Sequence, residues 1–197
     1  MKKIIIAAAV GLLVAGHVAA QEGPWLVRAR AVHLEMVNDA SSGLTSLGLT
    51  VDNKTIPELD ISYFFNKNVA AELVLTVPQE QTVSSNGTSI GTFKHLPPTL
   101  TLQYHFTDLG GYKPYVGAGV NYTKISSVSL ASPYSLGSHS WGGALQAGVD
   151  IPLDKQWSLN FDVKKVYLRA DVFSSTTNAG VLRLDPTLVG VGVGYRF

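Results

Sequence analysis

Apolar and polar residues alternate over eight stretches of the chain, as expected for β-strands whose two faces meet different surroundings. The C-terminal stretch is the clearest, because Val189, Val191, Val193, Tyr195 and Phe197 are separated only by glycine and arginine. The stretches cover residues 25–33, 58–65, 69–77, 98–106, 114–123, 141–151, 157 to about 172, and 182–197. Most are close to the roughly 9–11 residues that a tilted strand needs to cross a membrane. The pattern predicts an all-β fold, an eight-stranded antiparallel transmembrane β-barrel.

The connections between these stretches alternate in length. Residues 66–68, 107–112 and 152–156 form short connections, whereas residues 34–57, 78–97, 124–140 and 173–181 form long ones. Barrels of bacterial outer membranes have short periplasmic turns and long extracellular loops. Because the strand number is even, both chain termini are expected at the short-turn rim.

Aromatic residues gather near the same rim. They are Trp25, Tyr63, Phe65, Tyr104, Phe106, Tyr112, Trp157, Tyr195 and Phe197. An aromatic girdle of this kind marks a membrane–water interface. A soluble eight-stranded barrel would instead place apolar residues inside and polar residues outside, and alternation alone does not separate the two. The girdle, the unequal connections and the terminal aromatic residue favour the membrane barrel. We expect Tyr195 and Phe197 to act as the assembly signal for the barrel-assembly machinery.

The N-terminus has the three parts of a secretory signal peptide. Lys2 and Lys3 precede an apolar run of 13 residues, 4–16, and Val18-Ala19-Ala20 provides a small-residue cleavage site. The run is too short for a transmembrane helix. We predict that residues 1–20 are cleaved and that residues 21–197 form the barrel in the bacterial outer membrane.

Charge and composition exclude several classes of protein. Removing residues 1–20 takes away two lysines and no acid, so the net charge changes from +1 to −1. The mature chain therefore lacks the basic excess of a nucleic-acid-binding protein. The absence of cysteine fits an exported protein that needs no disulfide. His33, His95 and His105 fall on different strands at different expected depths, so we expect no metal site and no cofactor.

Six motifs along the mature chain suggest a family. They are residues 25–30 (WLVRAR), 94–100 (KHLPPTL), 103–106 (QYHF), 113–122 (KPYVGAGVNY), 183–186 (RLDP) and 194–197 (GYRF). These motifs resemble the OmpW family of outer-membrane β-barrel proteins (OmpW/AlkL-like). The resemblance implies an eight-stranded barrel that mediates the passage of small hydrophobic molecules across the outer membrane. The first and third long connections match the family less well, so the resemblance does not name the ligand.

Many of the inward-facing positions are charged. We expect one set of them to form a paired ionic floor in the periplasmic half of the lumen: Arg28, Arg30, Glu58, Asp60, Glu72, Asp162, Lys164 and Arg196. Asp150, Gln103, His105 and Gln146 also face inward. The interior of an eight-stranded barrel is just wide enough for side chains to fill, and an unpaired buried charge is costly. The ionic floor is either a purely structural plug or a barrier to straight-through passage.

The long connections carry apolar residues, including Leu44, Leu49 and Ile125. These segments are extended hairpins or short helices that pack on each other, the lining of an apolar vestibule, or both. Pro97 and Pro98 begin a strand, and neither can donate a ladder hydrogen bond. They mark either the lateral exit of an apolar solute through the barrel wall or simply the end of a strand. The alternative to lateral exit is an axial route, in which the solute passes straight through the lumen.

Three classes of function remain. The favoured one is passage of small hydrophobic solutes by a barrel that also contacts outer-membrane lipid and lipopolysaccharide. The second is a structural barrel or a phage or bacteriocin receptor without transport. The third is a lipid-modifying enzyme, but His139 lies between Ser138 and Ser140 without a nucleophile-elbow pattern. We therefore expect no catalytic residue and no enzymatic activity.

Overall fold

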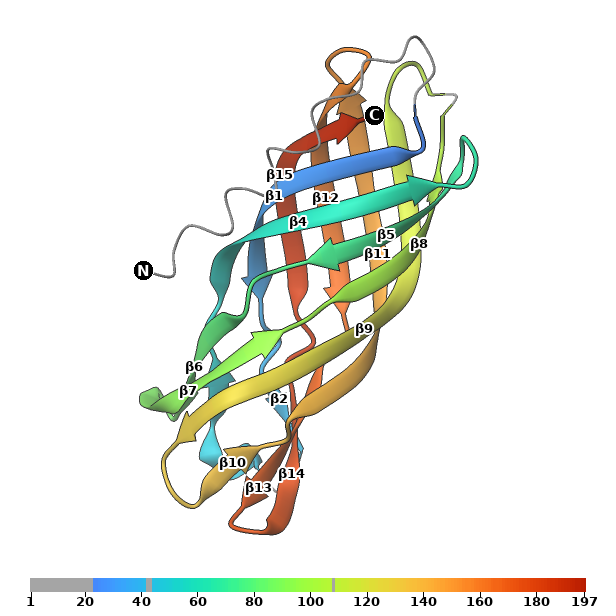
Figure 1. Ribbon diagram of the computed structural model, residues 1–197. Helices are drawn as coiled ribbons and strands as arrows, with labels where there is room; N and C mark the ends of the chain where they lie inside the picture. The colour runs from blue at the N-terminus through green and yellow to red at the C-terminus, as the bar shows by residue number, and fades with distance from the viewer. Residues whose placement is uncertain (1–22, 42–43, 108) are drawn as a thin grey trace, which may run out of the picture.

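Eight strands close into an antiparallel barrel in the computed structural model, which describes residues 23–41, 44–107 and 109–197 (Figure 1). The strand order around the barrel is β1-β4-β5-β8-β9-β11-β12-β15, and pairing of β15 with β1 closes the ring. The proposed signal peptide, residues 1–20, lies outside the described residues. The predicted all-β barrel is confirmed.

The barrel strands have the following bounds: β1 Trp25–Glu35, β4 Lys54–Phe64, β5 Val69–Leu75, β8 Thr99–His105, β9 Lys113–Leu130, β11 His139–Pro152, β12 Trp157–Val166 and β15 Thr187–Arg196. The remaining elements are β2 Asp39–Ala40, η1 Thr45–Leu47, β3 Leu49–Val51, β6 Gln79–Ser85, β7 Thr88–Leu96, β10 Tyr134–Leu136, β13 Arg169–Ser174 and β14 Thr177–Arg183. Among the described residues, no helix is long and apolar enough to cross a membrane.

The two faces of the barrel strands separate as the alternation predicts. Leu102, Val120 and Val191 are about half exposed on the outer face, whereas Arg28 and Glu72 are buried inside. At the short-turn rim the outward aromatic rings contact each other edge to face in pairs, with centroid distances of 4.8 Å for Trp25–Tyr63, 5.1 Å for Tyr104–Phe106 and 4.9 Å for Trp157–Tyr195. A barrel with an apolar outside and a polar inside is built for lipid surroundings.

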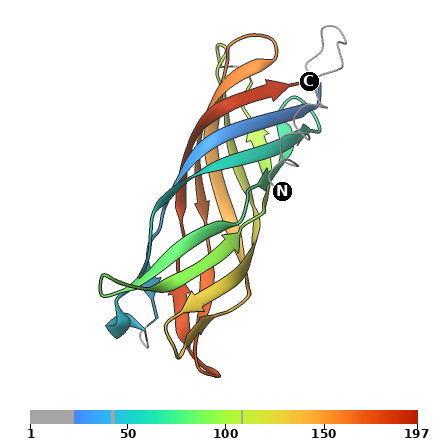
Figure 2. The same cartoon turned by 60° about the vertical axis from the view of Figure 1, so that its left-hand side comes forward.

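The long connections continue the barrel as strands at the end opposite the short turns, the lower end in Figure 1. β6 and β7 form a hairpin that pairs with β3 on one side and β9 on the other. β13 and β14 form a second hairpin that pairs with β10 and β2 (Figure 2). The expectation of extended hairpins and a short helix packing on each other is confirmed, with η1 as the short helix. We call this part of the molecule the long-hairpin end.

Several predicted strand bounds differ from the structure, and three strands differ most. β9 runs for 18 residues, well beyond the predicted end at Thr123. The predicted strands 157–172 and 182–197 are each divided in two, because the chain bends at residues 167–168 and 184–186. The bend is held by Asp185, which has a φ of 27° and accepts the Leu168 N–H through Oδ1 at 2.8 Å, and Pro186 cannot donate to a ladder. Across both bends, even-numbered residues continue to face inward and odd-numbered residues continue to face outward.

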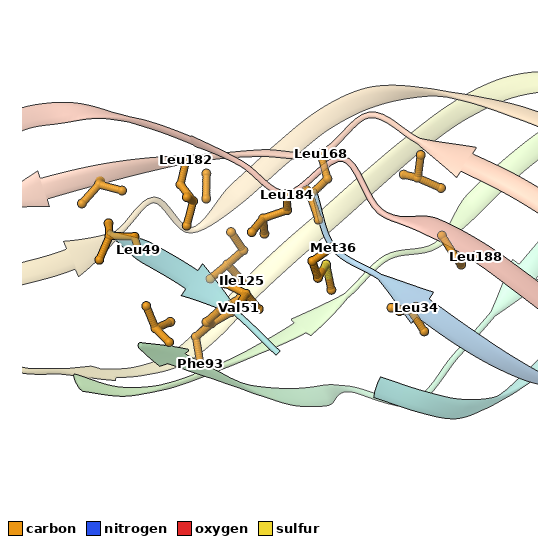
Figure 3. Close-up of a cluster of buried hydrophobic side chains, with 14 of the residues drawn as sticks. Leu34, Met36, Leu49, Val51, Phe93, Ile125, Leu168, Leu182, Leu184 and Leu188 are labelled. Atoms are coloured by element: carbon orange, nitrogen blue, oxygen red, sulfur yellow. The ribbon is translucent and has the colours of Figure 1, made fainter. Parts of the chain in front are cut away.

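Apolar side chains fill the inside of the long-hairpin end (Figure 3). Leu34 from β1, Met36 just after it, Phe93 from β7, Leu182 from β14 and Leu184 just after β14 meet there, each at most 7% exposed. Packing of side chains from segments far apart in sequence explains why these connections are ordered. The lumen therefore has two halves, a polar one toward the short turns and an apolar one at the long-hairpin end.

Candidate functional site

The polar half of the lumen contains a dense network of buried ion pairs. β1 supplies two arginines and β12 supplies Lys164, while the carboxylates come from β4, β5, β11 and β12. The period of two places each of these side chains inward, since every second residue of a strand points to the same face. Seven of the eight residues predicted for the ionic floor lie within it: Arg28, Arg30, Glu58, Asp60, Glu72, Asp162 and Lys164.

Arg28 lies at the centre of the network. Its Nε and Nη2 donate to the two oxygens of Asp150 at 3.0 and 2.6 Å, a bidentate pair across the lumen. Its Nη1 donates to Asp60 and Glu72, both at 3.2 Å. The side chain is fully buried and lies 5.2 Å from the centre of the Tyr115 ring. Charge-assisted bidentate pairs of this kind fix geometry as well as contribute energy.

Arg30 and Lys164 form the next layer toward the long-hairpin end. Arg30 donates to Glu58 at 2.9 Å and to Glu72 at 3.1 Å, and its Nη2 lies 3.2 Å from Asp60. The Lys164 ammonium lies 3.4 Å from Glu58 and 3.8 Å from Glu72. Glu72 is thus shared by all three cations, so loss of this one carboxylate would disturb both layers.

Neutral side chains add further hydrogen bonds to the carboxylates of the network. The Tyr115 hydroxyl and the Gln146 amide each donate to Asp162 at 2.7 Å. Asn160 donates to Asp150 at 2.9 Å and accepts from Arg30 at 2.7 Å. Every carboxylate in the network therefore has partners, as buried charges require.

The structure corrects the membership of the ionic floor at two positions. Asp150 belongs to it, although only its inward direction was predicted. Arg196 does not lie within the network: its Nε donates to the carbonyl of Gly23 at 2.8 Å, and its guanidinium stacks 4.0 Å from the Phe64 ring at the short-turn mouth. Arg196 lies outside the network because it is too close to the short-turn rim. Arg28 pairs in register with Gly194, and Arg196 is the next inward-facing position toward that rim.

The chain terminus is tied into the barrel seam. Phe197 donates its N–H to the Trp25 carbonyl at 3.0 Å, and its own carbonyl accepts from Trp25 at 3.4 Å. Its ring lies 5.8 Å from that of Tyr195, which in turn contacts the Trp157 ring edge to face. Of the two residues predicted as the assembly signal, Phe197 therefore forms the last rung between the first and last strands, and Tyr195 lies two residues before it, in register with Val27.

A small chamber lies between the ionic floor and the apolar core of the long-hairpin end. Its volume is about 20 Å³, and Glu58 and Lys164 form its lower boundary. Most of its lining is apolar and includes Leu34, Val74 and Leu188. A chamber of this size holds about one water molecule. Passage of any larger solute requires the apolar core above it to move.

The barrel wall is interrupted beside this chamber. β5 pairs with β8 only up to Val74–Thr99, and the ladder resumes at Gln79–His95 between β6 and β7. On the other side of β5, pairing with β4 begins at Leu59–Leu75 and continues only toward the short turns. Pro97 and Pro98 lie in the interruption, where their carbonyls accept from the Asn121 amide at 3.3 and 3.2 Å. Ladder pairing is thus absent where the sequence predicts poor pairing between β5 and β8, and it is also absent between β4 and the residues after Leu75, which the sequence did not indicate.

The histidines do not assemble a reactive centre. His139 is exposed on the outer face and its Nδ1 lies 3.1 Å from the Ser138 hydroxyl, whereas Asp150 and Asp162 point into the lumen. His95 is buried near the chamber, and His105 stacks on Tyr115 at 4.9 Å. Within the described residues, no group of three or more potential ligands is arranged to hold a metal ion.

The closed antiparallel barrel, its apolar outer face, its aromatic girdle and its polar lumen define a transmembrane β-barrel of the bacterial outer membrane. The OmpW family model matches residues 21–197, and the chain belongs to the OmpW family. The short turns are therefore periplasmic, and the long-hairpin end is extracellular.

Individual relatives agree with this assignment. The chain is 43% identical to the outer-membrane protein y4mB of Sinorhizobium fredii, over 91% of this chain and 82% of the relative. It is 34% identical to outer membrane protein W of Escherichia coli over the full length of both. It is 29% identical to the dibenzothiophene metabolism operon protein DoxH of a Pseudomonas species, over 90% of each. The crystal structure of OprG from Pseudomonas aeruginosa superposes with a TM-score of 0.74 at 27% identity, covering 90% of this chain and 98% of OprG.

Proposed function

We propose that this barrel passes small hydrophobic molecules from the extracellular side into the outer membrane, with exit sideways through the wall. The division of the lumen carries the proposal. An apolar solute that enters at the long-hairpin end meets Leu34, Phe93 and Leu184, and below them it meets the buried charges of the ionic floor. Moving an apolar solute past those charges would displace their partners, which is costly.

The interruption of the wall offers the alternative to that barrier. It lies at the level of the chamber, directly above the ionic floor, and Pro97 lines the chamber itself. The outward residues beside it, Leu75, Val77 and Leu100, are at least 40% exposed and face lipid. A solute that leaves there moves from one apolar surrounding to another. The name of DoxH, which refers to dibenzothiophene metabolism, supports an apolar cargo for a relative of this chain.

We further infer that the barrel is not an enzyme. The acid, base and hydroxyl groups needed for lipid modification lie on opposite sides of the wall, with His139 outside and the carboxylates of Asp150 and Asp162 inside. A receptor role for the extracellular hairpins is the competing function. Exchange of the β6–β7 hairpin with that of a relative should then change phage adsorption while uptake is unaffected.

Lateral exit is tested by replacing the two prolines with residues that have a backbone N–H group. The double variant Pro97→Val, Pro98→Thr should lower uptake of a small apolar probe by vesicles containing the barrel, because residue 97 gains an N–H group that can donate across the interruption. The new N–H of residue 98 faces β9, as the Pro98 carbonyl does when it accepts from Tyr122 at 3.1 Å, and strengthens that side of the wall. Pro114→Thr makes a similar change at the periplasmic end of β9 and should leave uptake unchanged. Heat-modifiable migration on a gel shows that each variant forms a closed barrel.

If solutes instead pass axially through the lumen, uptake should depend on the width of the lumen and not on the prolines. Gly117 faces the lumen, and an added Cβ would lie 3.2 Å from the Gln103 side chain and 3.3 Å from that of Gln146. Gly117→Val therefore narrows the polar half of the lumen. Normal uptake by the proline variant together with lost uptake by the glycine variant would exclude exit through the wall.

A further inference from the structure

The outer wall carries a groove just above the lipid-facing band, which we call the arginine groove. It is lined by Asp39, His139, Trp141, Arg169, Asp171 and Arg183, among others, and has a volume of about 680 Å³. These residues come from β2, β11, β13 and β14, which lie together at the extracellular end of one side of the barrel (Figure 1). Its position, charge and aromatic content point to one kind of ligand.

The residues of the groove lie in phase with the lipid-facing positions beneath them. On β12 and β13 the outward series runs from Phe161 and Val163, both more than 40% exposed, through Tyr167 to Arg169. On β11 it runs from Leu145 to Trp141, which at 69% has the largest exposed fraction of any large apolar side chain described. The groove therefore begins where the hydrocarbon band ends, at the level of the headgroups of the outer leaflet.

Two arginines face each other in the groove. Arg169 on β13 pairs in register with Arg183 on β14, and Arg183 pairs in register with Asp39 on β2. Like charges directly opposite each other on neighbouring strands are unfavourable. Among the described residues, the Arg169 guanidinium has no hydrogen-bond or ion-pair partner, and Arg183 has only a loose contact with Asp39 at 4.0 Å. An anion between the two guanidinium groups would remove the repulsion.

The remaining groups suit a phosphorylated sugar. The Trp141 ring contacts the Tyr122 ring in a tilted arrangement at a centroid distance of 4.8 Å, and the Tyr122 ring stacks with His139 at 6.5 Å, so an aromatic surface borders the arginines. Asp39 and Asp171 supply acceptors for hydroxyl or amide hydrogens. Guanidinium groups bind phosphate in a planar, bidentate manner, and aromatic faces pack on sugar rings and acyl chains at the membrane interface.

We propose that the arginine groove binds the phosphorylated sugar headgroup of lipopolysaccharide, with its acyl chains lying along the apolar wall below Trp141. Arg169 and Arg183 bind the phosphate, and Trp141 contacts the sugar and the first methylene groups. This interaction is independent of solute passage, because the groove lies on the outer face and the ionic floor lies inside the barrel.

The test compares lipid ligands that differ only in phosphate. Purified barrel in a neutral detergent is titrated with bisphosphorylated lipid A or with its dephosphorylated form, and binding is followed by the rise in thermal unfolding temperature. Bisphosphorylated lipid A should stabilise the protein, and Arg169→Gln with Arg183→Gln should weaken binding by roughly 30-fold, since each basic group near an anionic lipid contributes about a factor of five. Lys94→Gln, on the β6–β7 hairpin, should bind normally.

The outcomes separate this site from its alternatives. Equal stabilisation by dephosphorylated lipid A would overturn the proposal, because the arginines would then have no phosphate to recognise. Equal stabilisation by inorganic phosphate at the same concentration would also overturn it, since the site would bind a free anion rather than a lipid. Without lipid, the double variant should be at least as stable as the parent, because the opposed positive charges are gone. A variant that folds normally and still binds bisphosphorylated lipid A tightly would refute the role of the arginines.

Discussion

Replacing Arg28 with methionine is the sharpest test of the ionic floor as a dry, paired network. The substitution keeps most of the side-chain volume but removes the donors to Asp150, Asp60 and Glu72, which are then left buried with fewer partners. Removing one member of a buried pair destabilises proteins by about 3–5 kcal/mol. Because Arg28 is fully buried and bonded to three carboxylates, we expect the loss in free energy of unfolding to reach that range.

The matched control lies on the surface of the same molecule. Lys94 and Glu80 form an ion pair of 3.8 Å between side chains that are 44% and 58% exposed. Exposed pairs contribute about 0.2–1 kcal/mol, so Lys94→Met should change stability by less than 1 kcal/mol. A double variant Arg28→Met, Asp150→Leu should recover part of the loss, because an apolar pair can replace a buried ion pair without leaving a lone charge.

The assay is equilibrium urea unfolding in lipid vesicles, followed by tryptophan fluorescence, with ion conductance across a planar bilayer as a second measurement. Conductance should rise in Arg28→Met, because the variant loses the side chain at the centre of the barrier. If Arg28→Met costs no more than Lys94→Met and conducts ions as the parent does, water reaches the network and the ionic floor is not a barrier.

Three further predictions concern other parts of the molecule. Deletion of Phe197 removes two backbone hydrogen bonds to Trp25 and should cost about 2 kcal/mol and lower the amount of assembled barrel in the outer membrane; normal levels would contradict its role as an assembly signal. Burial and the neighbouring Lys54 ammonium lower the pKa of His95, on the extracellular β7 strand, from 6.5 to about 4. Between these two pH values the unfolded chain binds more protons than the folded protein, so the stability is full above pH 6.5 and should fall by about 3 kcal/mol as the pH drops to 4. His95→Gln should abolish this pH dependence, whereas the exposed control His33→Gln should leave it unchanged. Gly148→Ala should destabilise by about 1–3 kcal/mol, because the new Cβ would meet the Tyr115 ring and the Phe161 carbonyl, whereas at Gly143 the nearest atom is 3.7 Å away and alanine should be neutral.

The direction of the lumen residues was predictable, but their depth and partners were not. Alternation with a period of two assigns Arg28 and Asp150 to the inside whatever their neighbours are. Their contact joins residues 122 positions apart and depends on how strongly the strands are staggered around the ring, which one sequence does not specify. For the same reason Arg196 points inward as predicted but lies one inward position too close to the short-turn rim to join the network.

The long-hairpin end was predicted less completely because its strands lack apolar contrast. β6 places Gln79 and Gln81 at its buried positions, so the sequence around them has polar residues on both faces and no strand-like alternation. β9 continues past Thr123 through a residue with positive φ, Ser127, where the alternation slips. The pairing with β7 that orders this segment is between parts of the chain far apart in sequence, and tertiary context determines it.

The distribution of charge among the strands has a consequence for how the barrel enters the membrane. Two of the three cations of the ionic floor are on β1, the first strand synthesised, and the bidentate partner of Arg28 is on β11. A partly formed sheet of β1, β4 and β5 would neutralise only some of these groups and would hold the others in hydrocarbon, where an isolated charge is strongly unfavourable. Half-inserted sheets are thus penalised until the last strand joins the first. Insertion and ring closure should therefore occur as one cooperative step, in which the membrane itself selects against incomplete barrels.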